Sequence, residues 1–409
     1  MKTAMHPAPS TGISASLVER AAWLLLCALV FTMPWEKAVI LPGLGSISRA
    51  AGLAAFGVAA IAVWRRGALR PPNLVLALGA VFVCWNLASW AWSLDRAATL
   101  TRAVTLAQVW AMLWLIWEFA RSAARQCQLM AVYLAGAVAG SSIGIARYAM
   151  HLETYYRRYA ATGFDPNDFG LLLALSLPMA FYLGLGANGW RRWLCYGAAA
   201  VVIAAILLTA SRTALIASFA AFAFVAGTWR GAAAFQRIAS LALLAYLLLN
   251  LLAIAPAPTR DRLATIPTEV AQGSINSRKQ IWKSGARVWL HHPVLGVGAG
   301  AYPEAVRPQL GTPTVPGARY VAHNTFLSVL VEGGVIGFAV WMALLGCLVL
   351  FLSMMPAPER ALCATLLIVW AIGVSTLTWE HYKGTWLVFG LIMAAWPQAW
   401  FGRRTVTCE

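Results

Sequence analysis

The sequence predicts an all-α polytopic membrane protein with about twelve transmembrane helices and one large loop that bears short helices. The chain has 409 residues, of which 61% are hydrophobic and 11% are charged, whereas a soluble domain is roughly 45–50% apolar and about 25% charged. Its mean hydropathy of +0.70 excludes a soluble or disordered chain. Its apolar runs are continuous, which excludes a β-barrel, because barrel strands alternate apolar and polar residues.

The predicted spans are apolar runs of about 20 residues, the length that crosses the hydrocarbon core of a bilayer. Twelve runs meet this criterion, at 17–35, 47–64, 73–92, 103–120, 128–149, 167–186, 193–210, 213–229, 237–255, 325–353, 361–379 and 382–400. We therefore divide the chain into transmembrane helices 1–9 (1–255), a polar loop (256–324), and transmembrane helices 10–12 with a tail (325–409).

The connections between the spans alternate in charge. The net charge is +17, and fourteen basic residues fall in the tails and in every second connection: Lys2, Arg20, Arg65, Arg66, Arg70, Arg121, Arg125, Arg191, Arg192, Arg230, Arg237, Arg360, Arg403 and Arg404. By the positive-inside rule, these connections and both termini face the cytoplasm. Such an excess of positive charge in a soluble protein would indicate nucleic acid. Here topology explains most of it, and membrane lipids are the expected partner of the rest.

The apolar run 193–229 contains 37 residues and a single charge, Arg212, near its middle. One straight helix of that length would rise about 55 Å, far more than a hydrocarbon core of about 30 Å. Because Arg192 and Arg230 are both predicted to be cytoplasmic, the run must form two helices. The sequence therefore places Arg212 at a tight turn on the outer side.

The polar loop 256–324 lies on the outer, periplasmic side in this topology. Within it, a capping box at Ser277–Gln280 predicts a helix that runs to about His291. Three basic residues recur at four-residue spacing and share one face of this helix: Lys279, Lys283 and Arg287. A helix with a basic face and tryptophans elsewhere around it suits the lipid headgroup layer.

Four motifs stand out between about residues 150 and 390. The first is His323-Asn324, followed by nine residues, Gly334, two residues and Gly337, where the loop meets the tenth span. The others are Arg157-Arg158 before Gly163-Phe164-Asp165-Pro166-Asn167, then Thr209-Ala210-Ser211-Arg212, and Arg278-x3-Trp282 before Pro293-Val294-Leu295-Gly296-Val297-Gly298. Together they resemble the O-antigen ligase and polymerase superfamily, and WaaL-type ligases in particular.

This resemblance implies a GT-C-like membrane glycosyltransferase. Such enzymes take a glycan from undecaprenyl diphosphate and attach it to an acceptor at the periplasmic face of the bacterial inner membrane. Ligases use lipid A–core in lipopolysaccharide biosynthesis, polymerases use another lipid-linked repeat, and related oligosaccharyltransferases use protein Ser or Thr. The single late outer loop favours the ligase by analogy.

A lipid-linked glycan transporter is the alternative from a different class. A transporter would bind the same lipid diphosphate without chemistry, and we would expect inverted repeats and ionisable residues near the midplane of the membrane. The sequence contains no detectable repeat, and its candidate cations gather at the outer rim. Both observations favour an enzyme.

The chemistry of glycan transfer can be argued from the residues. Displacing a sugar from a lipid diphosphate needs a base for the incoming hydroxyl and cations for the departing diphosphate. Histidine is the usual base near neutral pH, and arginine suits phosphate through its planar fork. We therefore assign His323 as the base and Arg212 and Arg278 as diphosphate-binding cations. Direct displacement inverts the anomeric centre, and arginines supply the charge that a metal would, so we expect no metal or other cofactor.

Five further residues are assigned to substrate binding: Arg157, Asn167, Trp282, Asn324 and Glu332. Each candidate also has a structural interpretation. A histidine at a helix start can cap backbone groups, and rim arginines such as Arg212 and Arg278 can reach lipid headgroups. Glu332, inside a span, either pairs with an arginine or stays protonated.

The acidic pair Asp165 and Asp168 allows two interpretations. The two carboxylates could hold a metal ion, but no third ligand is near them in the sequence. We prefer a helix start, with Asp165 as the N-cap, Pro166 in the first helical position and Asp168 in the first turn.

Overall fold

The structure is a computed structural model that describes residues 12–154, 158–228, 257, 260–261, 278–310 and 320–401. Its helices are α1 (Gly12–Thr32), α2 (Ile47–Arg66), α3 (Leu74–Ala88), α4 (Arg96–Phe119), α5 (Ala123–Ala149), α6 (Pro166–Gly186), α7 (Gly189–Thr209), α8 (Arg212–Thr228), α12 (Arg278–His291), α13 (Tyr302–Val306), α14 (Thr325–Ser353), α15 (Ala357–Val374) and α16 (Lys383–Phe401). The short elements are the 3₁₀ helices η1 (Met33–Ala38), η2 (Ser89–Ala91) and η4 (Arg307–Gln309), and the antiparallel strands β1 (Ile40–Leu41) and β2 (Gly45–Ser46).

The helices agree with the predicted spans wherever the chain is described. Within these residues, nine helices are long and apolar enough to cross a membrane, and α8 and α16 contain shorter apolar helices. Helices thus stand at eleven of the twelve predicted spans. The ninth predicted span, 237–255, lies outside the described residues. The protein is therefore an all-α, multi-pass membrane protein.

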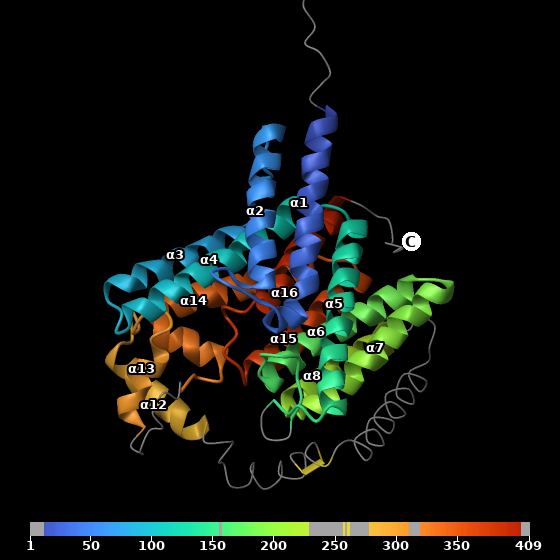
Figure 1. The fold of residues 1–409 in the computed structure, drawn as a ribbon. Helices are drawn as coiled ribbons and strands as arrows, with labels where there is room; N and C mark the ends of the chain where they lie inside the picture. The colour runs from blue at the N-terminus through green and yellow to red at the C-terminus, as the bar shows by residue number, and fades with distance from the viewer. Residues whose placement is uncertain are drawn as a thin grey trace, which may run out of the picture.

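The helices form one bundle with the outer-loop helices at one end (Figure 1). Helices α1 and α2 pack side by side and extend beyond the others, while α3, α4, α14 and α16 form one packed group. Helices α5, α6, α7, α8 and α15 form another. Helices α12 and α13 pack on α14, at the end of the bundle opposite to the start of α1.

The prediction that 193–229 forms two helices is confirmed. Helix α7 ends at Thr209, and α8 begins at Arg212. Between them, Ala210 has φ 47° and ψ 33°, a left-handed conformation that reverses the chain within two residues. Arg212 consequently stands at the first position of α8, at the turn where the sequence placed it.

Helix α14 is broken at Gly334, which has φ 62° and ψ −169°. Only glycine adopts this conformation readily. The segment Pro293–Gly298 lies in the break and takes the freed backbone groups: the Val297 nitrogen donates to the Val331 carbonyl (3.0 Å), and the Val335 nitrogen donates to the Pro293 carbonyl (2.9 Å). Inside a membrane protein such unwound backbone is tolerated where protein satisfies it.

The same packing explains the second glycine of the His-Asn motif. A Cβ on Gly337 would lie 2.8 Å from the Trp85 indole nitrogen, so that α3 can approach α14 only at a glycine. Trp85 donates its Nε1 hydrogen to the Gly333 carbonyl at 2.9 Å, next to the break. Both glycines of the motif thus serve close backbone packing.

A buried carboxylate joins the far ends of α2 and α4. The Glu118 side chain is fully buried and accepts hydrogen bonds from the guanidinium groups of Arg66 and Arg121. Its second oxygen accepts from the Arg70 backbone nitrogen at 3.1 Å. Three arginines of the predicted cytoplasmic connections therefore converge on one glutamate.

Candidate functional site

His323 lies at the junction between the outer loop and α14. Its backbone has φ 47°, a strained conformation for a residue other than glycine. The next residue, Asn324, is the N-cap of α14: its Oδ1 accepts from the Leu327 nitrogen at 3.0 Å, and its Nδ2 donates to the Ser375 carbonyl at 3.3 Å. The helix start therefore holds the backbone of His323 in place.

Trp282 supports the other side of His323. The predicted helix is present as α12, although its proposed cap, Ser277, lies outside the described residues. From α12, the half-buried Trp282 side chain donates its Nε1 hydrogen to the Ala322 carbonyl at 2.8 Å. The exposed basic residues of α12 lie elsewhere on the helix. Trp282 is thus a contact between α12 and the residue before His323.

Two charged residues act on the His323 imidazole. Burial lowers the pKa of His323, the positive charge of Arg278 lowers it further, and the negative charge of Asp165 raises it, so that the pKa is about 4. Arg278, at the start of α12, and Asp165, before α6, are therefore close enough to His323 for their charges to affect its pKa. At neutral pH the imidazole is uncharged and can accept a proton.

Arg158 connects α6 with the turn that holds Arg212. Its buried guanidinium donates to the Thr209 carbonyl through Nε (2.7 Å) and to Asn167 Oδ1 through Nη2 (2.8 Å). The sequence pointed to Arg157 of this pair, which lies outside the described residues. The predicted site residue Asn167 is therefore a contact of Arg158, and the adjacent arginines were the signal for it.

The helix start predicted at Asp165 is present. Asp165 Oδ1 accepts from the backbone nitrogens of Asn167 (2.8 Å) and Asp168 (3.4 Å), and Pro166 is the first residue of α6. Asp168, in the first turn of α6, also makes contacts outside its own helix. Its two carboxylate oxygens accept hydrogen bonds from Trp379 Nε1 and from the Tyr382 hydroxyl, each at 2.8 Å. The segment between α15 and α16 is thereby attached to α6.

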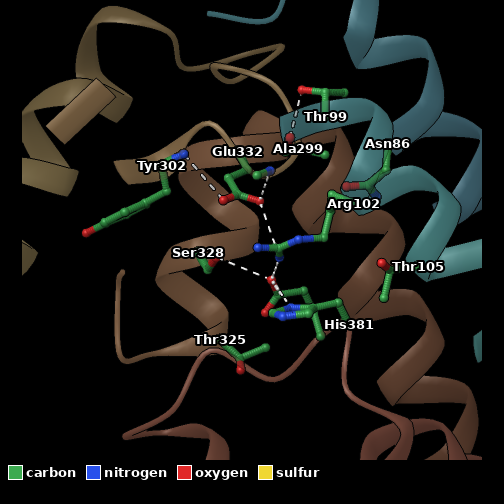
Figure 2. A network of polar contacts seen from close by, with 12 residues as sticks. Asn86, Thr99, Arg102, Thr105, Ala299, Tyr302, Thr325, Ser328, Glu332 and His381 are labelled. Atoms are coloured by element: carbon green, nitrogen blue, oxygen red, sulfur yellow. Dashed lines mark hydrogen bonds and ion pairs between the residues drawn. The ribbon is translucent and has the colours of Figure 1, made fainter. Parts of the chain in front are cut away.

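We call the residues around His323 the first cluster. Glu332 belongs to a second polar cluster, around Arg102 (Figure 2). Of the two interpretations of Glu332, pairing with an arginine agrees with the structure, because Arg102 Nη1 lies 3.8 Å from Glu332 Oε2. The same guanidinium binds Glu380. Glu332 also accepts from the backbone nitrogens of Gly300 (2.7 Å) and Tyr302 (3.4 Å), directly beside the break in α14.

Glu380 and His381 complete the cluster from the segment before α16. Glu380 Oε1 lies 3.2 Å from His381 Nδ1 and accepts a long hydrogen bond of 3.5 Å from the Ser328 hydroxyl. Burial raises the pKa of Glu380, but the charge of Arg102 and the contact with His381 lower it to about 2. Arg102 was not among the predicted site residues, because the predicted span began at residue 103, whereas α4 begins at Arg96 and contains Arg102.

The segment Trp379–Tyr382 links the two clusters. The Trp379 backbone nitrogen donates to Thr325 Oγ1 at 2.8 Å, two residues after His323. The next residue, Glu380, contacts Arg102, and Tyr382 contacts Asp168. One short segment thus touches the first turns of α6 and α14 and the second turn of α4.

Comparison with known families agrees with the motifs. Residues 197–342 match a family model described as O-Antigen ligase, and this range contains Arg212, Arg278 and His323. The resemblance to the O-antigen ligase and polymerase superfamily is therefore confirmed over this domain. Members of the family are membrane glycosyltransferase-like ligases and polymerases, and the family implies lipid-linked glycans and lipids as partners. No curated protein matches the chain.

Proposed function

We propose that this multi-pass protein is an O-antigen ligase of the bacterial inner membrane, with both termini in the cytoplasm. It transfers a glycan from undecaprenyl diphosphate to lipid A–core at the periplasmic face. One observation carries the proposal: the region that matches the ligase family contains Arg278 and His323, and His323 has a strained backbone that Trp282 and Asn324 hold from either side. A neutral base beside a permanent cation suits attack by a hydroxyl on a sugar diphosphate.

In the proposed reaction, a ring nitrogen of His323 takes the proton from an acceptor hydroxyl. The oxygen forms a bond to the anomeric carbon from the face opposite the diphosphate. The bond between that carbon and the diphosphate oxygen breaks, and the electron pair leaves with the diphosphate. Arg212 and Arg278 stabilise its charge, with Arg157 as a third cation. The anomeric centre is inverted.

The remaining candidates are proposed to support binding through their contacts. Trp282 and Asn324 hold the backbone on either side of His323. Asn167 contacts Arg158, which contacts the turn that precedes Arg212. Glu332 contacts the backbone of the outer loop.

The experiment is a transfer assay with the purified full-length protein in lipid nanodiscs, given undecaprenyl-diphosphate-linked glycan and lipid A–core. Glycan covalently attached to lipid A–core supports the ligase. Longer lipid-linked glycan without attachment to lipid A–core overturns it in favour of a polymerase. Movement of the donor across a proteoliposome membrane without any covalent product overturns it in favour of a transporter. His323→Ala serves as the inactive control.

A further inference from the structure

A cavity of about 560 Å³ lies beside the Arg102 cluster, and none of the residues assigned to the reaction, His323, Arg212 and Arg278, is among the described residues that line it. It is bordered by the first turns of α4, by the loop and short helix at Gly300–Arg307, and by His381. Its volume falls within the range of about 300–1,000 Å³ that small-ligand pockets occupy.

The charges around this cavity disfavour an anionic ligand. Asp95 and Glu304 line it, and Glu332 and Glu380 stand behind Arg102. Against these four carboxylates the cavity has two arginines, Arg102, which binds two of them, and Arg307, which lies 3.3 Å from Glu304. A diphosphate would be repelled here, whereas near His323 it would meet the positive charge of Arg278.

The uncharged groups of the cavity are hydrogen-bond acceptors. The Thr101 and Thr105 hydroxyls each donate to a backbone carbonyl of α4 (3.0 and 2.9 Å), so that their oxygens remain able to accept. His381 Nδ1 faces Glu380 Oε1 at 3.2 Å, and when Nδ1 carries the proton of this bond, Nε2 accepts. Burial lowers the pKa of His381, and the charge of Arg102 lowers it further, which favours the neutral ring.

The Glu380 carboxylate contacts His381 through only one of its two oxygens, Oε1. Glu380 is 97% buried, and among the described residues its Oε2 has no hydrogen-bond partner. A buried carboxylate oxygen without a donor is unfavourable, and each such atom calls for an explanation. This oxygen is enclosed by protein behind His381, and Glu380 is not among the residues that line the cavity. A ligand that brings several hydroxyl donors would suit the acceptors of the lining itself, the Thr101 and Thr105 hydroxyls and the His381 ring.

We propose that this cavity is a carbohydrate subsite that binds a sugar ring through its hydroxyl groups. The inference rests on the proposed function, in which two glycans are joined. The ring belongs either to the acceptor oligosaccharide or to the donor glycan. His381 lies in the segment whose Trp379 nitrogen donates to Thr325, two residues after His323, so one short segment connects the subsite with the proposed reaction centre.

The test places a bulky side chain in the cavity, at a residue that takes no part in the ion pairs of Arg102. Thr101 is exposed on α4 and lines the cavity, so Thr101→Trp obstructs it. Leu100→Trp is the matched control, because Leu100 is the neighbouring residue, is 52% exposed and does not line the cavity. Thr105→Val is a second variant of nearly unchanged shape, which removes one acceptor oxygen.

Binding is measured by calorimetry on the full-length protein in nanodiscs, with two free saccharides as probes. The first is the core oligosaccharide without lipid A, and the second is the O-antigen repeat without its lipid. We expect Thr101→Trp to weaken one of them by about tenfold or more and Thr105→Val by about threefold, with Leu100→Trp within about twofold of the unmodified protein. The saccharide affected identifies the source of the ring.

The same variants are assayed for transfer. The KM of the affected substrate should rise by about tenfold in Thr101→Trp, with kcat close to that of Leu100→Trp. The subsite is overturned if neither saccharide binds, if both bind the variants and the control equally, or if only kcat falls. If saccharide binding depends on Thr101 but the unmodified protein transfers no glycan, the subsite stands and the ligase proposal fails.

Discussion

At the scale of single residues, His323 combines a strained backbone, a lowered pKa and support on both sides. Trp282 holds the preceding carbonyl, and Asn324 caps the following helix. Such strain persists only where the surrounding structure enforces it, and it is found at functional sites more often than elsewhere.

Replacement of His323 by alanine should abolish transfer. Loss of a general base commonly lowers the rate by about 10²–10⁴-fold. Donor binding should persist, because the base acts on the acceptor proton and not on the diphosphate. Transfer and lipid-donor binding are measured on the same preparation. His291→Ala, at an exposed histidine of α12, is the control. A variant that retains more than about a tenth of the rate would contradict the assignment.

The dependence of kcat/KM on pH should reflect the lowered pKa of His323. A base with a pKa of about 4 is neutral throughout the neutral range. Activity should therefore stay level from about pH 8 down to about pH 6 and be lost only as the pH falls toward 4, where the imidazole gains a proton. An acidic limb centred near pH 6.5, the ordinary value for histidine, would show that the base is another group or is not shielded.

Arg212 allows the geometry of a cation to be separated from its charge. We expect Arg212→Lys to be nearly as damaging to transfer as Arg212→Ala, because lysine keeps the charge and loses the two-pronged fork that binds a diphosphate. Arg360→Lys, in a predicted cytoplasmic connection, is the control. If Arg212→Lys retains most of the activity, Arg212 acts only as a point charge near the headgroups.

At the scale of elements, the break in α14 determines where the outer loop docks. Segment Pro293–Gly298 satisfies the backbone of the break, and Glu332 beside it accepts from the loop backbone. In the sequence, this arrangement appears as two glycines at fixed positions after His323. Only the structure shows that these glycines allow close packing against Val294 and Trp85.

Gly334→Ala should prevent correct folding. A Cβ at this position would lie 2.1 Å from the Val294 carbonyl oxygen, and the backbone conformation excludes alanine. We expect a loss of about 3 kcal/mol or more of stability, seen as loss of the monodisperse peak in size-exclusion chromatography. Gly346→Ala, on the same helix and with no atom within 4 Å of a new Cβ, should elute as the unmodified protein does. Normal behaviour of Gly334→Ala would refute the docking.

At the scale of the whole molecule, the ion pairs lie at two levels of the bundle. Arg102 with Glu332 and Glu380 joins α4, α14 and the segment before α16. Glu118 joins the far ends of α2 and α4 to the connection that follows each. Because both glutamates of the first level and Glu118 are buried, each level depends on complete pairing.

Glu118→Gln should destabilise the protein strongly. The change removes the buried carboxylate that Arg66 and Arg121 share, although Arg66 keeps its pair with Glu19 at 2.9 Å. Breaking a buried ion pair costs about 3–5 kcal/mol. Thermal unfolding in nanodiscs measures the effect. Glu304→Gln removes an exposed pair with Arg307 and should change stability by about 0–1 kcal/mol. Equal effects of the two variants would mean that burial does not strengthen the Glu118 cluster.

The sequence by itself determined the features that depend on neighbouring residues. Hydropathy predicted the long apolar helices that the structure describes, and the charges on either side of 193–229 required the turn before Arg212. Local capping chemistry predicted the start of α6 at Asp165. Such signals are contained within a few turns of one helix, so they are readable without the rest of the fold.

Only the tertiary structure decided which distant side chains meet. Arg102 and Glu380 are 278 residues apart, and Asp168 and Trp379 are 211 apart. No local sequence pattern in α4 or α6 predicts these partners. Which side chains meet depends on how the helices fit together in shape and on the need to pair buried charges. The need to hydrogen-bond buried polar groups brought Arg158 to Asn167, and it joined the backbone of segment Pro293–Gly298 to the break in α14.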